Sequence, residues 1–416
     1  MKHSITSISA REIIDSRGNP TVEAKVIIEK KFKGTASVPS GASTGIHEAS
    51  ELRDNDKKRY NGKGVLRAVK NVNTIIAKKI AGKNFSSLNE IDGVLIALDG
   101  TKNKSRLGAN AILSVSMACA RAFANEKKLP LYAYLRKTFF LNVRGWKMPR
   151  CMMNIMNGGA HANVSTDFQE YMILPQFKSV ARQVQCGSEI FHSLKNIIAS
   201  KKLPTTVGDE GGFALRAKNN EEPLQLISKA IEIAGYNSQT VKFGLDVASS
   251  EFYSNGKYIL KTEGSKNTSE KMTNYYKNLI IKYPVVSIED ALAEDDWEGW
   301  HYLTKILGKK IYLIGDDLFV TNIERLKRGI KQNIANAILI KINQIGTITE
   351  TIDTILEAKK YLYALAISHR SGETTDDFIS DLTIASGAEF IKTGSLCRGE
   401  RTAKYNRLME IEEEVT

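Results

Sequence analysis

The chain of 416 residues has only four cysteines, and no two of them form a Cys-x-x-Cys pair. This scarcity argues against a disulfide framework or a cysteine-based zinc site, and it favours a reducing compartment. No stretch reaches the roughly 18 apolar residues that span a bilayer. The first residues also lack the apolar core of a signal peptide. We therefore expect a cytoplasmic protein without a membrane span.

The bulk composition has few extremes. A hydrophobic fraction of 42% and a charged fraction of 25% are ordinary for a globular protein. A chain of 416 residues is long for one core, so two domains are expected. The net charge of +13 is high, but the lysines are dispersed and no long basic run alternates with aromatic residues. We interpret the charge as a solvated lysine-rich surface and weight RNA binding well below that.

The first third of the chain predicts a smaller α+β domain. Alternating and β-branched residues at 21–28 predict a strand, and the glycines within 40–45 predict a loop. Apolar residues recur at helical spacing within 65–79 and 109–126. We therefore expect an N-terminal capping domain over residues 1–136.

An irregular connector follows, and it contains Gly145 and Pro149. Beyond it, strand and helix patterns alternate almost to the end of the chain. This alternation predicts parallel strands joined by crossover helices. We expect the second domain, with the active site, over residues 137–416.

Charged residues end the apolar runs of this second domain. Five runs and a shorter sixth end in Asp246, Glu289, Asp316, Lys341, His369 and Lys392, respectively. From Glu289 onward these residues follow one another at intervals of 23 to 28 residues. One strand, one helix and two loops take about that length in a (β/α)8 barrel of about 250 residues. A single such residue would usually cap the next helix, but six in phase predict one shared pocket at the C-terminal face of a TIM-like barrel.

Such a pocket would combine three carboxylates with several cations. Three acidic oxygen ligands, without cysteine or paired histidines, suit Mg²⁺ better than zinc. A cation beside Lys341 would lower the pKa of this lysine and make it a competent general base. Lys392, His369 and Arg370 would attract an anionic substrate. For each lysine, a salt bridge to the acids is the alternative interpretation.

From end to end, the chain resembles the enolase family, in its bacterial type. The resemblance rests on short segments in the family's order: Asp15-Ser-Arg-Gly-Asn-Pro-Thr-Val-Glu23, Val38-Pro-Ser-Gly-Ala-Ser-Thr-Gly45, Gly208-Asp-Glu-Gly-Gly-Phe213, Ser287-Ile-Glu-Asp290, Ala293-Glu-Asp-Asp-Trp297, Ile314-Gly-Asp-Asp-Leu318, Ile340-Lys-Ile-Asn-Gln-Ile-Gly-Thr347, Ser368-His-Arg-Ser-Gly-Glu-Thr374 and Ile391-Lys-Thr-Gly-Ser395. Any one of these could arise by chance, but their order and completeness are specific.

The resemblance implies a fold, a reaction and a cofactor. The fold is an enolase-type barrel preceded by a smaller α+β domain. The reaction is the glycolytic, reversible dehydration of 2-phosphoglycerate to phosphoenolpyruvate through an enolate-type intermediate, catalysed by a hydro-lyase. The cofactor is Mg²⁺, with two ions per active site and the second arriving with the substrate.

The resemblance also implies roles for individual residues. Lys341 would abstract the α-proton and Glu210 would help the β-hydroxyl leave, with His369, Glu170 and His161 as further catalytic residues. Substrate contacts would come from Gln169, Arg370, Ser371, Lys392, His161 and Glu170. The metal ligands would be Asp246, Glu289, Asp316 and Ser43, with Ser43 serving the second ion.

Three other functions stay open on the sequence alone. One is an enzyme of the wider enolase superfamily that acts on an unphosphorylated acid, and another is a Schiff-base aldolase that uses Lys341. The third is a binding protein for RNA, an RNA-degradation complex or a host surface. The resemblance implies a homodimer, and secondary secretion or cell-surface display, as in related enolases, is compatible with it.

Overall fold

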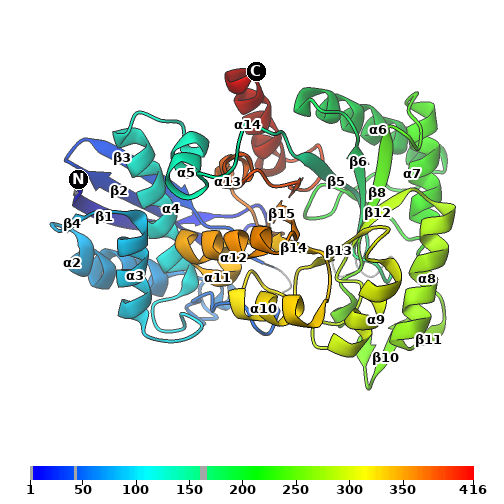
Figure 1. The fold of residues 1–416 in the computed structure, drawn as a ribbon, viewed down its shortest axis with the longest axis horizontal. Coiled ribbons are helices and arrows are strands. Elements are labelled where there is room, and N and C mark those ends of the chain that lie inside the picture. The colour runs from blue at the N-terminus through cyan, green and yellow to red at the C-terminus, as the bar shows by residue number, and fades with distance from the viewer. Residues whose placement is uncertain (1–2, 42–44, 160–165) are drawn as a thin grey trace.

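The computed structural model describes residues 3–41, 45–159 and 166–416 (Figure 1). The N-terminal part contains an antiparallel sheet in the order β3-β2-β1-β4. Its strands are β1 (His3–Ile14), β2 (Pro20–Ile28), β3 (Phe32–Ser37) and β4 (Asn84–Phe85). The predicted strand at 21–28 is thus confirmed as part of β2.

Helices cover one face of this sheet: α1 (Leu66–Lys70), α2 (Ala77–Ile80), α3 (Leu88–Asp99) and α4 (Ala109–Glu126). Helix α4 has the predicted bounds and is buried on nearly all sides. It approaches β3 so closely that a Cβ on Gly34 would lie 1.9 Å from the carbonyl oxygen of Ala118. The small residues of α4 and a glycine in β3 are therefore what this packing distance requires.

The C-terminal part is a closed barrel. Among the described residues, its strands follow one another in the order β5-β6-β8-β12-β13-β14-β15-β16, and a β16–β5 pairing closes the ring. Their bounds are β5 (Arg150–Asn157), β6 (Glu170–Pro175), β8 (Val241–Asp246), β12 (Val285–Glu289), β13 (Tyr312–Gly315), β14 (Ala337–Ile340), β15 (Ala364–Ser368) and β16 (Phe390–Lys392). The predicted TIM-like barrel, preceded by a smaller α+β domain, is confirmed.

One strand departs from the expected parallel arrangement. β6 runs antiparallel to both of its neighbours, β5 and β8. Its first residue, Glu170, pairs with Asn157 at the end of β5 and with Asp246 at the end of β8. The reversal therefore brings the beginning of β6, rather than its end, to the face where the parallel strands end.

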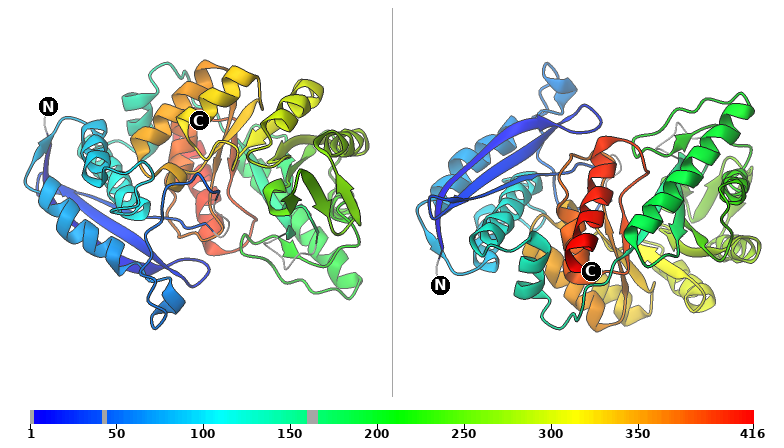
Figure 2. Two further views of the ribbon diagram at one scale, coloured as in Figure 1. Left: turned by 90° about the horizontal axis from the view of Figure 1, so that it is seen from below. Right: turned by 90° about the horizontal axis from the view of Figure 1, so that it is seen from above.

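Helices surround the barrel (Figure 2). They are α6 (Val180–Ser200), α7 (Glu222–Ile233), α8 (Ser269–Lys282), α9 (Trp297–Leu307), α10 (Ile323–Gln332), α11 (Ile342–Ile345), α12 (Ile348–Lys360), α13 (Phe378–Ser386) and α14 (Gly399–Val415). Several begin at a side chain that caps the first turn, such as Asp296 before α9 and Thr347 before α12. Apolar residues of β5, β6 and β13–β16 form a separate buried cluster, the packed interior typical of such barrels.

The predicted domain boundary between residues 136 and 137 falls inside α5 (Leu131–Phe139). This helix packs against α13 of the barrel. The boundary itself stays a prediction.

The N-terminal part lies directly against the mouth of the barrel. Ser40 and Gly372 exchange backbone hydrogen bonds of 2.7 and 2.8 Å, and the N–H of Ser16 donates to the carbonyl oxygen of Glu373 at 2.7 Å. Residues from the first part of the chain therefore contribute to the wall of any site built on the loop after β15.

A partly buried ion pair strengthens this contact between the two parts. Arg121 of α4 donates to both carboxylate oxygens of Asp376 at 2.6 and 2.9 Å. Replacing Arg121 by alanine should lower the free energy of unfolding by about 3 kcal/mol, because it leaves the largely buried Asp376 carboxylate without its cation. Urea denaturation would measure this. Arg11→Ala is the control, since the Arg11 side chain is 73% exposed beside Glu23 and its loss should change stability very little. A similar effect of both changes would contradict the prediction.

Candidate active site

The mouth of the barrel gathers most of the residues that the sequence singled out. Asp246, Glu289 and Lys392 are the last residues of their strands, and Asp316, Lys341 and His369 directly follow theirs. One pocket at this mouth is lined by Gln169, Glu170, Glu210, Asp246, Lys341, Ser368, His369, Arg370, Ser371 and Lys392. Ser43 and His161 lie outside the described residues.

Lys392 is the central cation of the pocket. Its Nζ lies 2.8 Å from Asp246 Oδ2, 2.8 Å from Glu289 Oε1 and 3.2 Å from Glu170 Oε2. All four side chains are buried. Burial opposes the charge of the lysine, but the three acids together raise its pKa well above the ordinary value. Burial raises the pKa values of Glu289 and Glu170, and the nearby acids Asp246 and Glu210, respectively, raise them further.

Lys341, which is half-buried, forms a second ion pair, with the buried Asp316. Burial opposes the charge of Lys341, but Asp316 raises its pKa above the ordinary value. The sequence predicts a lowered pKa for Lys341 beside a metal ion. In the protein alone the pKa is raised instead, because a direct carboxylate contact outweighs burial. In the protein without ligands, both Lys341 and Lys392 form salt bridges to the acids, as the alternative interpretation predicts.

The acidic side of the pocket fits a hard divalent cation. Asp246 and Glu289 already hold one positive group between them, and both come from neighbouring strands. Glu289 Oε2 is buried and has no hydrogen-bond partner among the residues that the structure describes. A buried carboxylate oxygen without a donor is an available ligand atom, and oxygen-only donor sets suit Mg²⁺.

A second group of acids lies close by. Oxygens of Asp290, Asp316 and Asp317 lie within 4.8 Å of one another. However, the two carboxylate oxygens of Asp290 accept the backbone N–H groups of Asp316 and Asp317, each at 2.9 Å. Asp290 therefore orients the loop after β13, whereas Glu289 keeps an oxygen free. We expect a cation on the Glu289 side.

His369 and Glu210 meet in the same pocket. His369 Nε2 lies 3.4 Å from Glu210 Oε2, and Asn154 Nδ2 donates to the same oxygen at 3.0 Å. Burial lowers the pKa of His369 to about 3, although Glu210 acts in the other direction. His369 is therefore a neutral hydrogen-bonding group at physiological pH.

Arg370 and Ser371 also line the pocket, and Arg370 adds a further cation to it. Arg370 Nη1 and Nη2 donate to Glu48 at 2.9 and 3.1 Å, and Nη1 also donates to Asn343 Oδ1 at 3.1 Å. A buried guanidinium group that forks onto a carboxylate has the geometry that also binds phosphate.

Sequence reasoning missed three residues of this site. Glu48 comes from the other domain, and Asn154 and Arg401 do not end a predicted apolar run, so the strand-end pattern had no signal for them. Glu170 was found only through the family resemblance. Glu170 nevertheless lies among the strand-end residues at the mouth, because the reversed strand β6 pairs it with Asp246.

These features define a two-domain barrel protein. One mouth of its barrel holds acid–base residues, a cluster of carboxylates suited to a metal ion, and several cationic side chains. Family models agree: the enolase N-terminal domain matches residues 5–135, and the enolase C-terminal TIM barrel domain matches residues 146–416. The chain belongs to the enolase family. The family domains support an enolase-type reaction and a lyase-type enzyme. In the described part of the chain, no helix is long and apolar enough to cross a membrane.

Proposed function

We propose that this protein is a glycolytic enolase, a hydro-lyase that reversibly dehydrates 2-phosphoglycerate to phosphoenolpyruvate with Mg²⁺. The observation that carries the proposal is the composition of one buried pocket. Lys341, Glu210, Asp246 and Arg370 all line it, and this combination of an amine, carboxylates and a guanidinium group supports acid–base chemistry on an anionic substrate. Cytoplasmic location and a homodimer are part of the proposal and rest on the family.

The proposed substrate lies with its two anionic ends at different walls. Arg370 and Ser371 bind the phosphate, because the guanidinium group offers paired donors. Lys392 and Gln169 lie toward the substrate carboxylate. Glu170 and His161 would have supporting polar roles where a loop closes over the substrate. His161 lies outside the described residues. Binding of an anion on Arg370 requires Glu48 to share or release that side chain.

The proposed reaction begins with proton removal by Lys341. The proton beside a carboxylate is very weakly acidic, so its removal needs concentrated positive charge. Asp246, Glu289 and Asp316 would hold the first Mg²⁺, and Ser43 would join the second when substrate arrives. The bound ions would supply positive charge to the substrate carboxylate. Lys341 can accept a proton only as a neutral amine, so its contact with Asp316 has to loosen first. Glu210 then donates a proton to the departing hydroxyl group.

A comparison of two substrates tests the proposal. With Mg²⁺ present, the protein should convert 2-phosphoglycerate to a product that absorbs as a conjugated enol phosphate. Glycerate, which lacks the phosphate, should show no turnover, because Arg370 and Ser371 lose their ligand. Comparable turnover of glycerate would favour the wider superfamily. Borohydride trapping of Lys341 with a carbonyl substrate would favour the aldolase, and inactivity with both acids would leave binding as the function.

A further inference from the structure

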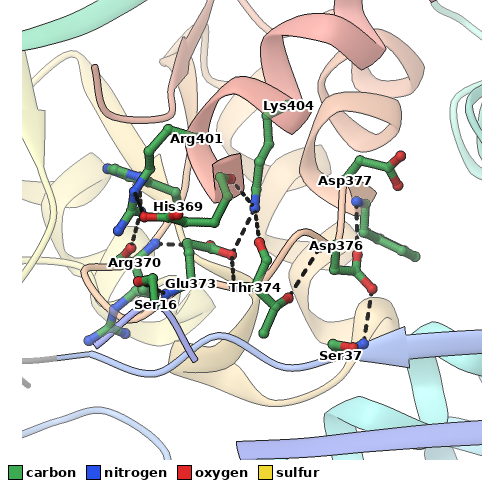
Figure 3. A network of polar contacts seen from close by, with 12 residues as sticks. Ser16, Ser37, His369, Arg370, Glu373, Thr374, Asp376, Asp377, Arg401 and Lys404 are labelled. Atoms are coloured by element: carbon green, nitrogen blue, oxygen red, sulfur yellow. Dashed lines mark hydrogen bonds and ion pairs between the residues drawn. The ribbon is translucent and has the colours of Figure 1, made fainter. Parts of the chain in front are cut away.

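A buried arginine, Arg401, lies next to His369, which lines the pocket. Arg401 stands in the first turn of α14, and its side chain is 0% exposed. Figure 3 shows its guanidinium group beside His369 and the loop that follows β15. The strand-end pattern and the proposed mechanism give this residue no role.

The guanidinium group connects two loops of the site. Nη1 donates to His369 Nδ1 and to the carbonyl oxygen of Arg370, both at 2.6 Å. Nη2 donates to the carbonyl oxygens of Ser371 at 2.6 Å and Asp209 at 3.1 Å. The loop that carries His369 and the loop that carries Glu210 are therefore held by the same side chain.

These contacts determine where the proton of His369 lies. Each Nη atom has two hydrogens, and the four acceptors use all of them. A guanidinium group has no acceptor atom, so Nδ1 of His369 must accept. The imidazole is then neutral and carries its single proton on Nε2. This nitrogen lies 3.4 Å from Glu210 Oε2.

Packing supports the same arrangement. Gly394 has a φ of +78°, and a Cβ there would lie 2.8 Å from Arg401 Cδ, 2.8 Å from the carbonyl oxygen of Glu210 and 3.1 Å from His369 Cε1. A side chain at this position would separate the three residues. The chain therefore keeps the arginine, the histidine and the Glu210 loop in direct contact.

We propose that Arg401 is a positioning residue, which fixes His369 as the neutral tautomer protonated on Nε2 and holds that nitrogen near Glu210. The effect on catalysis rests on the proposed function, in which Glu210 donates a proton. The tautomer of His369 does not depend on that function and can be measured without any substrate.

Nitrogen NMR of protein labelled with ¹⁵N-histidine tests the proposal. The chain has six histidines, and the spectrum of the His369→Gln variant identifies the signals of His369. In the unmodified protein we expect Nε2 protonated and Nδ1 unprotonated across neutral pH. In Arg401→Met, Nδ1 loses its donor, so we expect a mixture of tautomers. We also expect kcat to fall about 10- to 100-fold, the size typical when a group that orients a histidine is removed, with a much smaller change in KM.

A second buried cation of the same helix provides the control. Lys404 is buried and donates to Glu373 Oε2 at 3.0 Å and to the carbonyl oxygen of Glu400 at 2.7 Å, and its partners within the described ranges do not include His369. Lys404→Met should therefore lower stability without changing the His369 tautomer. Arg401→Lys should preserve the tautomer and part of kcat, because an ammonium group also only donates.

Two results would overturn the proposal. One is a proton on Nδ1 of His369 in the unmodified protein, a measurement that stays decisive even when Arg401→Met does not fold. The other is an unchanged tautomer in a folded Arg401→Met variant. Absence of 2-phosphoglycerate turnover in the unmodified protein would instead refute the proposed function and leave the tautomer result standing.

Discussion

Replacing Lys341 by alanine is expected to abolish both the dehydration of 2-phosphoglycerate and the exchange of its α-hydrogen with solvent. Without this amine no enolate-type intermediate forms, and general bases typically contribute about 10²–10⁴-fold in rate. Glu210→Gln should also slow dehydration, but it should still permit exchange, because the α-proton leaves before the hydroxyl group. Deuterium exchange into 2-phosphoglycerate, followed by NMR, separates the two steps.

Lys104→Ala is the matched control for the lysine variant. Lys104 is buried and, like Lys341, ion-paired, with Glu350 at 2.9 Å, but it lies outside the pocket. Its loss should affect stability and leave exchange intact. Exchange that survives in Lys341→Ala and disappears in Glu210→Gln would reverse the proposed roles. Unchanged turnover in either variant would remove that residue from the mechanism.

Removal of divalent cations is expected to eliminate activity completely, and Mg²⁺ should restore it. Asp316→Asn removes one of three proposed ligand charges, so it should weaken Mg²⁺ binding by more than the roughly 10- to 100-fold loss caused by changes to a ligand's outer partners. Isothermal titration calorimetry and the activity assay would measure the two effects separately. Full activity of the metal-free enzyme would contradict the proposal.

Two further variants distinguish the two clusters of acidic residues at which the cation could bind. If the cation binds between Asp246, Glu289 and Asp316, Glu289→Gln should weaken binding strongly and Asp317→Asn only slightly. The opposite order would place the ion among Asp290, Asp316 and Asp317, whose oxygens lie within 4.8 Å of one another. The free Oε2 of Glu289 leads us to expect the first result.

The regular part of the barrel was predictable from the sequence because its local signals agree. Each parallel strand is a short apolar run, and each ends at the same face. The charged residues after these runs, such as Glu289 and His369, therefore had to lie near one another. The intervals between them also fit one strand and one helix. Helix α4 was predictable for a similar reason, since its small and apolar residues recur through its whole length.

The remainder depends on contacts between distant segments. An apolar run carries no information about strand direction, so the reversal of β6 and the place of Glu170 were not predictable from spacing. Glu48 reaches Arg370 from the other domain, and Arg401 reaches His369 from the last helix. The raised pKa of Lys341 follows from its contact with Asp316, which only the folded chain brings about. The domain boundary and the individual roles of the site residues stay predictions.

The reversed strand also affects how the chain tolerates changes in length. Most neighbouring strands of the barrel are parallel, so their connections must travel from the mouth to the opposite end, and helices take up small differences on the way. β5 and β6 are antiparallel, and Asn157 pairs with Glu170 at the mouth. The connection between them therefore starts and finishes beside the pocket. An insertion or deletion between Asn157 and Glu170 therefore changes the chain at the mouth itself, and it should act directly on the space open to the substrate.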